Sequence, residues 1–227
     1  MSTSLTRLAV FDVDGTLIDS QHNIVASMLH ACERNNVPPP ADEAIRRIIG
    51  LSLLEAVMRL LPDAEPDLIG RVVEDYKNGF AEMRVRPDHH EPLFPGAVEA
   101  LDALEKEGWI LAVATGKSRR GLLAMIERHG FEGRFVSLQC ADDNPGKPHP
   151  AMLRRAIAEA GSRAEETVMI GDTSYDMQMG RSAGTHTVGV AWGYHAPEEL
   201  LATGADVIVE SYPRLAGLLA GLFVQAQ

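Results

Sequence analysis

Short, continuous apolar runs recur along the chain and predict the strands of a buried sheet. Runs of about four to eight apolar residues, bounded by turn residues, are typical of strands buried on both faces of a parallel sheet. The first run covers residues 8–11 and ends at Asp12. The later runs that predict strands cover residues 109–114, 135–138, 167–170, 186–190 and 206–209.

Helical patterns lie between these predicted strands in the second half of the chain. They cover residues 97–107, 119–129, 150–160 and 174–183, and each is followed by a glycine, which commonly ends a helix. Strands that alternate with helices of about 10–15 residues indicate right-handed crossovers and a parallel sheet. We therefore predict an α/β protein with a Rossmann-like parallel sheet between two layers of helices, a three-layer α/β/α core.

Residues 21–88 interrupt this alternation, because every pattern in them is helical. Helices are predicted at residues 23–35, 42–49, 53–61 and 66–84. Proline-containing stretches such as residues 87–95 flank the region and suit a hinge. We predict two domains: an α/β core domain made of residues 1–20 and 89–227, and an all-helical domain of residues 21–88 inserted after the first strand.

The composition is that of an ordinary globular protein, with 45% hydrophobic and 23% charged residues among 227. The 21 basic and 32 acidic side chains give a formal charge of −11, so nucleic acids and anionic membranes would repel the chain. We expect neither as a partner. A small anionic substrate held by a few local cations is compatible with this charge, and the sequence does not indicate an oligomeric state.

Three further features favour a cytoplasmic protein. No stretch of about 18 apolar residues predicts a membrane span, and residues 1–5 do not begin a signal peptide. Cys32 and Cys140 lack the spacing of a metal site or a disulfide framework. They are typical of reduced thiols in a core, with a structural disulfide as the alternative.

Carboxylates cluster at the ends of two predicted strands. Asp12 and Asp14 directly follow the first strand, and Asp172 and Asp176 follow the strand at residues 167–170. Ligands of open α/β sheets bind at this edge. Converging carboxylates repel one another unless some are protonated or a cation neutralises them, and an all-oxygen ligand set favours Mg²⁺ over zinc. Asp176 also suits the first turn of a helix.

Two further candidates could bind a phosphate. The Thr115 hydroxyl and the backbone N–H of Gly116 precede a predicted helix and could hold phosphate oxygens, although helix capping explains them equally well. Lys147 lies between two prolines on the loop after the third predicted strand, where it could neutralise an aspartate and a phosphate; a surface lysine is the alternative. The segment from Gly116 to Ser118 is similar to the end of a P-loop, but Leu111 stands where that motif requires glycine.

Together, these clusters in this order resemble the haloacid dehalogenase superfamily, and the resemblance covers nearly the whole chain. The helical insertion is similar to the cap domain of that superfamily. The chain also resembles the phosphoglycolate phosphatase-like branch of that superfamily, through the stretches FDVDGTLIDS, IIGLSL, GKPHP and AWGYH followed by GAD.

The resemblance implies a role for each motif residue. Asp12 would attack phosphorus and become an aspartyl phosphate. Asp14 would protonate the leaving alkoxide and then deprotonate the hydrolytic water. Thr115 and the Gly116 N–H would hold phosphoryl oxygens, and Lys147 would stabilise Asp12 and the phosphate.

The resemblance also implies the cofactor, Mg²⁺. The carboxylates of Asp12 and Asp172 and the backbone carbonyl of Asp14 would bind the ion. Asp176 would be an additional ligand or would support the ligands. The family pattern thus implies a Mg²⁺-dependent phosphatase, a hydrolase of small phosphomonoesters, and we expect 2-phosphoglycolate to be the substrate.

Two alternatives stay open at this point. A sugar phosphomutase would share the same core. A non-catalytic phospho-aspartate signalling module would also use strand-end carboxylates, but would give the helical insertion no purpose. Asp14 argues against a dehalogenase, and the absence of a lysine before Lys77 argues against a phosphonate hydrolase.

Residues of the helical insertion are candidates for contacts with the leaving group of the ester. These candidates are Arg47, Gly50 and Ser52, together with Arg46 and Leu51. The alternative explanation is that they form a helix end and its solvated face.

Overall fold

The structure is a computed structural model that describes residues 6–86 and 89–224. The predictions made for residues 1–5 and for the linker residues 87–88 lie outside this part. In chain order the elements are β1 (Leu8–Phe11), α1 (Gln21–Arg34), α2 (Asp42–Arg47), α3 (Leu53–Leu60), α4 (Pro66–Arg84), α5 (Ala97–Lys106), β2 (Ile110–Thr115), α6 (Arg119–His129), β3 (Ser137–Cys140), α7 (Ala151–Ala160), η1 (Ala164–Glu166), β4 (Thr167–Gly171), α8 (Ser174–Ala183), β5 (His186–Val190), α9 (Pro197–Thr203), β6 (Val207–Val209), η2 (Tyr212–Arg214) and α10 (Leu215–Val224).

The strands form one parallel sheet of six strands in the order β3-β2-β1-β4-β5-β6. β1 lies in the interior of the sheet, where Phe11 pairs with Val113 of β2 and with Ile170 of β4. All four residues of β1 are fully buried, which explains why this strand is a continuous apolar run rather than an alternating one. The predicted α/β fold is confirmed.

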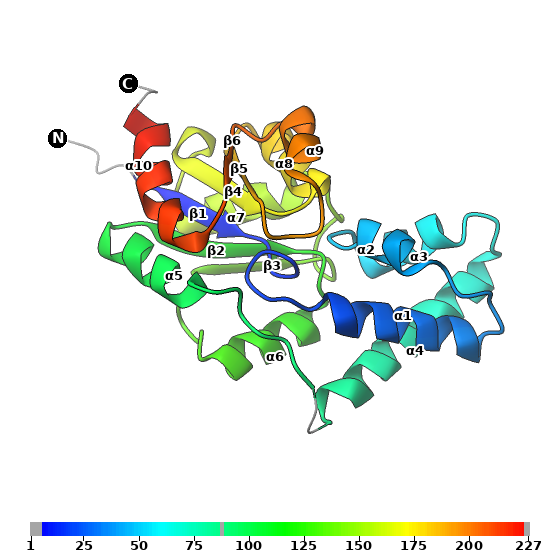
Figure 1. Cartoon of the computed structure of the whole chain (residues 1–227). Helices are drawn as coiled ribbons and strands as arrows, with labels where there is room; N and C mark the ends of the chain where they lie inside the picture. The colour runs from blue at the N-terminus through cyan, green and yellow to red at the C-terminus, as the bar shows by residue number, and fades with distance from the viewer. Residues whose placement is uncertain (1–5, 87–88, 225–227) are drawn as a thin grey trace.

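Helices cover both faces of the sheet (Figure 1). Because successive side chains of a strand point to opposite faces, Ala9 and Phe11 pack in one hydrophobic cluster and Leu8 and Val10 in another. The first cluster includes side chains of α5, α6 and α10, and the second includes side chains of α7 and α8. The sheet is therefore the middle layer of three.

Helices α1 to α4 pack together beside this core, at the right of Figure 1. They have a hydrophobic cluster of their own, which includes Met28, Ile45, Val57 and Val72. We call this helical region the cap. The chain enters and leaves it through segments that lie side by side, since the Asp19 N–H donates to the Pro92 carbonyl at 2.9 Å. The division into domains at residues 20 and 88 stays a prediction.

One strand is displaced from its predicted position. The apolar run at residues 135–138 predicts a strand, but β3 begins at Ser137. Phe135 packs edge to face on Phe131 in the hydrophobic cluster before the strand starts, with 6.0 Å between ring centroids. The strand itself contains buried polar residues whose groups are satisfied by hydrogen bonds, as in the 2.7 Å bond from Ser137 Oγ to Glu159. Hydrophobicity therefore marks the residues before β3 rather than the strand.

Helices α9 and α10 are not foreseen by the sequence patterns. α9 has only 7 residues, and α10 is apolar without a clear period. None of the helices within residues 6–86 and 89–224 has both the length and the apolar character needed to cross a membrane. Cys32 and Cys140 are buried free thiols.

Candidate active site

Adjacent strands bring the predicted site residues together. β1 pairs with both β2 and β4, so the ends of these three strands meet at one edge of the sheet. Asp12 follows β1, Thr115 ends β2 and Asp172 follows β4. Asp12 also extends the ladder, because its N–H donates to the Ile170 carbonyl at 2.9 Å. Residues up to 160 positions apart in the chain therefore share one site.

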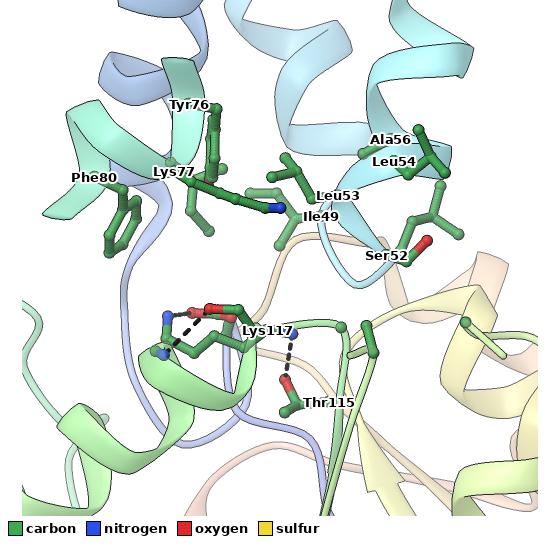
Figure 2. A pocket seen from close by; sticks show the side chains of 18 of the residues that line it. Ile49, Ser52, Leu53, Leu54, Ala56, Tyr76, Lys77, Phe80, Thr115 and Lys117 are labelled. Carbon is green, nitrogen blue, oxygen red and sulfur yellow. Dashed lines mark hydrogen bonds and ion pairs between the residues drawn. The ribbon is translucent and has the colours of Figure 1, made fainter. Parts of the chain in front are cut away.

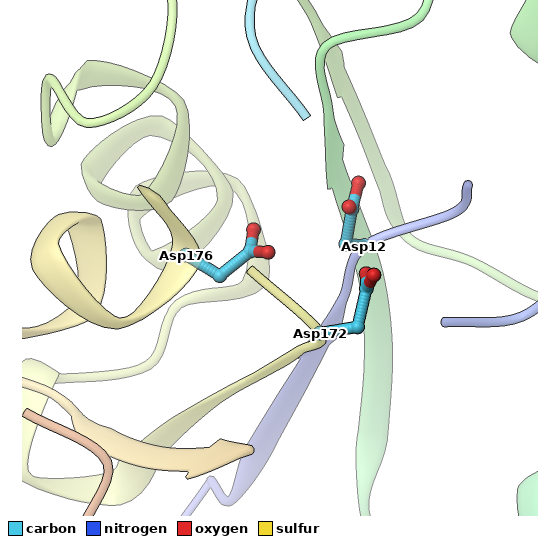
Figure 3. Close-up of side chains that lie close together, drawn as sticks. All are labelled: Asp12, Asp172 and Asp176. Carbon is cyan, nitrogen blue, oxygen red and sulfur yellow. The ribbon is translucent and has the colours of Figure 1, made fainter. Parts of the chain in front are cut away.

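Three buried carboxylates converge at this edge (Figure 3). Oxygens of Asp12, Asp172 and Asp176 lie within 4.8 Å of one another, and none of the three residues is more than 1% exposed. Asp176 is fixed by the start of α8, where its Oδ2 accepts hydrogen bonds from the N–H and the hydroxyl of Thr173. Its expected place in the first turn of a helix is confirmed.

Lys147 is the cation of this cluster. Its Nζ lies 2.7 Å from Asp12 Oδ1 and 2.6 Å from Asp176 Oδ1, and the side chain is fully buried. Burial by itself lowers the pKa of Lys147, but the two adjacent carboxylates outweigh it and raise the pKa above its usual value. Lys147 is thus an ammonium ion inside the site, and the alternative of a surface lysine is excluded.

One lysine does not offset the charge of the cluster. Burial raises the pKa of Asp12 to about 7; Lys147 opposes this shift, while Asp176 and Asp14 add to it. Burial and the charges of Asp12 and Asp176 also raise the pKa of Asp172 well above its usual value. Asp12 Oδ2 is buried and has no hydrogen-bond partner among the described residues. These carboxylates therefore fit a further cation, and their oxygen-only donors suit Mg²⁺.

The remaining residues of the first motif orient Asp172. The Thr16 hydroxyl donates to Asp172 Oδ1 and the Tyr194 N–H donates to Oδ2, each at 2.9 Å. Gly15 has a φ of +87°, and a Cβ at this position would overlap Asp172 Oδ2. Glycine is therefore required for both its backbone conformation and its close approach.

Asp14 lies in a different environment from Asp12. Its Oδ1 accepts a 2.6 Å hydrogen bond from the Ser20 hydroxyl and a 2.7 Å hydrogen bond from Lys117 Nζ. Lys117 Nζ also lies 3.6 Å from Glu91 Oε1. Burial lowers the pKa of Lys117, but Asp14 and Glu91 outweigh it and raise the pKa. Two carboxylates with different partners can take different roles in a reaction.

Ser20, Glu91 and Lys117 were not identified as site residues from the sequence. For Lys117 a signal existed: the chain has only four lysines, and this one lies two residues after Thr115. Ser20 and Glu91 lie on the two segments that connect core and cap. They are far apart in the sequence, so nothing in their spacing suggests that both side chains lie at the same site.

Thr115 and Gly116 remain available to a ligand. Ser118, not Thr115, caps α6 by accepting from the Gly121 N–H, so capping does not account for Thr115. The Thr115 hydroxyl accepts from the Lys117 N–H at 3.2 Å. A Cβ on Gly116 would overlap the carbonyl oxygens of Gly50 and Leu51, so this glycine allows the cap to contact the core.

A cavity of about 310 Å³ lies between the cap and this edge of the sheet. Asp12, Asp14, Thr115 and Gly116 line it on the core side, and part of its lining is drawn in Figure 2. Gly50 and Ser52, two of the predicted substrate contacts, line it on the cap side.

The structure places Arg47, the third predicted substrate contact, elsewhere. Arg47 is not among the residues that line the cavity. Its guanidinium pairs with Glu199 at 2.6 Å, and its carbonyl accepts from the Tyr175 hydroxyl at 3.1 Å. Arg47 therefore joins the cap to α8 and α9 on the surface.

The sequence profile of the haloacid dehalogenase-like hydrolases matches residues 9–190, which include the site residues Asp12, Asp14, Thr115, Lys147, Asp172 and Asp176. The chain belongs to the haloacid dehalogenase-like hydrolase family. The family predicted from the motifs is confirmed, and with it the prediction of a hydrolase.

Individual known proteins are similar to the chain over most of their length. The protein named probable phosphatase IndB from Dickeya dadantii is 36% identical over 213 residues, which is 92% of each chain. A phosphoglycolate phosphatase from Agrobacterium fabrum is 29% identical, over 94% of this chain and 92% of its own. The crystal structure of a hydrolase from Pseudomonas syringae, 27% identical, matches 95% of this chain and 99% of its own with a TM-score of 0.85.

Proposed function

We propose that this member of the haloacid dehalogenase-like hydrolases is a Mg²⁺-dependent phosphatase that hydrolyses a small phosphomonoester through a phosphoryl group carried on Asp12. The observation that supports this most strongly is the state of the Asp12 carboxylate. Lys147 fixes one of its oxygens, the other has no hydrogen-bond partner among the described residues, and the residue lines a cavity together with Thr115 and Gly116.

In the first half of the reaction, the Asp12 carboxylate forms a bond to phosphorus while the bond from phosphorus to the ester oxygen breaks. The ester oxygen keeps the bonding electron pair and takes a proton from Asp14. Lys147 holds Asp12 in position throughout, and the Thr115 hydroxyl and the Gly116 N–H bind phosphoryl oxygens.

In the second half, Asp14 takes a proton from a water molecule. The water oxygen bonds to phosphorus, the bond from phosphorus to Asp12 breaks, and inorganic phosphate leaves. Asp12 is thereby regenerated as a carboxylate and Asp14 as an acid, so that another cycle can begin.

Asp12, Asp172 and the backbone carbonyl of Asp14 would hold Mg²⁺, which would supply positive charge beside the phosphoryl oxygens. Asp176 was expected either to be an additional ligand or to support the ligands. Because Lys147 and Thr173 engage its two oxygens, we propose that it supports the site by positioning Lys147.

The names of the relatives bear on the identity of the ester. The substrate suggested by the motifs is 2-phosphoglycolate, and one relative described above is named phosphoglycolate phosphatase. Another is named only as a phosphatase. We therefore propose the class of small phosphomonoesters, with 2-phosphoglycolate as the reference compound for assays.

Counting turnovers distinguishes this function from the two alternatives. The purified protein is incubated with Mg²⁺ and a large excess of 2-phosphoglycolate, ethyl phosphate or p-nitrophenyl phosphate, and inorganic phosphate is measured. A phosphatase releases many equivalents per chain and a signalling module at most one. A phosphomutase releases almost none from these esters but converts a sugar phosphate such as glucose 1-phosphate, supplied in a parallel assay, into its isomer.

Substitution of Asp12 then locates the chemistry. Asp12→Asn is expected to abolish turnover while circular dichroism and the thermal melt show a folded protein. The control is Asp63→Asn, which changes an exposed aspartate before α4 and keeps normal activity. Near-normal kcat in the Asp12→Asn protein would show that Asp12 does not carry the phosphoryl group.

A further inference from the structure

The cap side of the cavity has an apolar wall. It consists of the side chains Ile24 and Met28 of α1, Ile49 and Leu53 from the α2–α3 region, and Val73, Tyr76 and Phe80 of α4. Figure 2 shows Ile49, Leu53, Tyr76 and Phe80 on one side of an open space, with Thr115 and Lys117 on the opposite side. The apolar wall thus faces Thr115, which is proposed to bind phosphate, and Lys117, which contacts the proposed acid Asp14.

The apolar wall is connected to the proposed general acid. Lys117 Nζ lies 2.7 Å from Asp14 and 5.2 Å from the centre of the Phe80 ring. Phe80 is in turn 5.9 Å from Tyr76 between ring centroids. An ester whose oxygen reaches Asp14 therefore directs the rest of its leaving group toward these rings.

The apolar wall belongs to the packed core of the cap. Met28, Ile49, Val73 and Phe80 are each less than 9% exposed and pack in the hydrophobic cluster of the cap. A ligand in the cavity consequently meets side chains that the fold already holds in place, which limits the ordering needed on binding.

The cavity is larger than the leaving group of 2-phosphoglycolate requires. Its volume of about 310 Å³ falls within the range of about 300–1,000 Å³ that is typical of pockets for larger small-molecule ligands. Glycolate is small and polar, so it would leave water against the apolar wall. A leaving group with an apolar body would displace that water and gain the corresponding free energy of transfer.

We infer that the ester cleaved here has a leaving group with an apolar body, an alkyl chain or an aromatic ring, that packs on the apolar wall. This inference rests on the proposed phosphatase function and narrows its substrate class. The phosphoryl group meets the same residues in every phosphomonoester, and the apolar wall adds a preference for those with an apolar body.

A series of n-alkyl phosphates from ethyl to hexyl tests the inference, because all have similarly basic leaving alcohols and differ in apolar length. The value of kcat/KM should rise by up to about fourfold for each added methylene until the cavity is filled, the factor that corresponds to burial of one methylene. Benzyl phosphate should also exceed ethyl phosphate. The reference compound 2-phosphoglycolate is measured alongside.

Ala81 offers a variant that fills the cavity. It lines the cavity from α4, and Ala81→Phe should remove the dependence of kcat/KM on chain length. The matched control is Ala202→Phe, at an exposed position of α9 outside the cavity, which should retain the dependence. If Ala81→Phe does not fold, Val73→Thr adds a hydroxyl to the apolar wall at similar volume and should weaken the dependence.

The outcomes separate the inference from the proposed function. A flat or falling series, in a protein that turns over ethyl phosphate or 2-phosphoglycolate, overturns the inference and leaves the phosphatase function intact. A rising series that persists unchanged in a folded Ala81→Phe or Val73→Thr protein also overturns it, because another surface would then bind the chain. Absence of turnover with every ester overturns both.

Discussion

Lys117 places its ammonium group 2.7 Å from the carboxylate of Asp14, although 103 residues separate them in the sequence. The same ammonium lies 3.6 Å from Glu91, which is on the segment that returns from the cap to the core. All three side chains are at most 10% exposed. Lys117 is therefore the cation that offsets two buried carboxylates at the junction of cap and core.

Loss of Lys117 should destabilise the protein. In Lys117→Met, Asp14 and Glu91 would keep their contacts with Ser20 and His89 but lose the ammonium between them. Breaking a buried pair in this way costs about 3–5 kcal/mol. The measurement is the free energy of unfolding from urea titration. Adding Glu91→Gln to the same protein should recover part of the loss, since it removes one of the uncompensated charges.

The matched control Lys77→Met changes a lysine that pairs with Glu74 on the surface of α4 and should change the free energy of unfolding by less than about 1 kcal/mol. Equal losses in the two lysine variants would contradict the proposed charge balance.

The role of Asp14 as the acid predicts a dependence on the leaving group. Asp14→Asn should lower kcat by about 10²–10⁴-fold for ethyl phosphate, because the departing alkoxide then receives no proton from the enzyme. The loss should be much smaller for p-nitrophenyl phosphate in the first step, since nitrophenolate is stable without a proton. Burst kinetics with the two esters measure this difference. A burst rate lowered by the same factor for both would mean that Asp14 acts in another way, for instance by holding Asp12.

The sequence patterns predict the scaffold well because burial leaves a strong signal in them. Strand β5 and helices α6 and α8 have the predicted bounds, and β1 was recognised from four fully buried apolar residues. Strand β3 was misplaced by two residues because its buried Ser137 and Gln139 are polar. Patterns of hydrophobicity therefore locate the elements whose buried side chains are apolar. They misplace elements such as β3, whose buried side chains are polar and hydrogen-bonded.

The site was predictable only where its residues stand in compact motifs. Asp12 and Asp172 each follow a recognisable strand, so the pairing of β1 with β4 was enough to bring them together. The contact of Lys117 with Asp14 depends on how the loop after β2 turns, and the pairing of Arg47 with Glu199 depends on how the cap meets α9. Neither relationship is encoded by spacing along the chain.

Binding of Mg²⁺ should stabilise the protein more at high pH than at low pH. Burial raises the pKa of Asp12 from 3.8 to about 7, so between these values the folded state binds more protons than the unfolded state. The contribution of Asp12 to the stability of the metal-free protein therefore falls as the pH rises through this window. Mg²⁺ competes with the proton for the carboxylate, and its stabilising effect grows as the proton leaves.

Thermal melts with EDTA or saturating Mg²⁺ check this expectation. The increase in Tm caused by Mg²⁺ should be larger near pH 8 than near pH 5, and Asp172→Asn should reduce it at both. EDTA should abolish phosphatase activity and added Mg²⁺ should restore it, with Asp172→Ala requiring more Mg²⁺. Full activity in the chelator, or a shift in Tm that does not depend on pH, would contradict the assignment of these carboxylates to the metal.

Arg84 should favour esters that carry a second negative charge. It lines the cavity, and its guanidinium carbon lies 5.2 Å from the centre of the Phe80 ring, the same distance as Lys117 Nζ. Burial lowers the pKa of Arg84, Glu91 opposes this, and the neighbouring Arg120 lowers it further. Because Arg84 lines the cavity, an anionic group of a ligand there can bind its guanidinium.

Replacing Arg84 separates this effect from general binding. Arg84→Gln should raise KM for 2-phosphoglycolate by about tenfold or more, because a hydrogen bond to a charged group contributes about 1.5–3 kcal/mol, and should leave KM for ethyl phosphate nearly unchanged. Arg71→Gln, at an exposed position earlier in α4, is the matched control and should alter neither KM value.

An equal rise of KM for both esters would place Arg84 at the phosphoryl group instead. The absence of any effect on 2-phosphoglycolate would mean that its carboxylate is bound by other residues, such as Lys117 or Arg120, which line the same cavity.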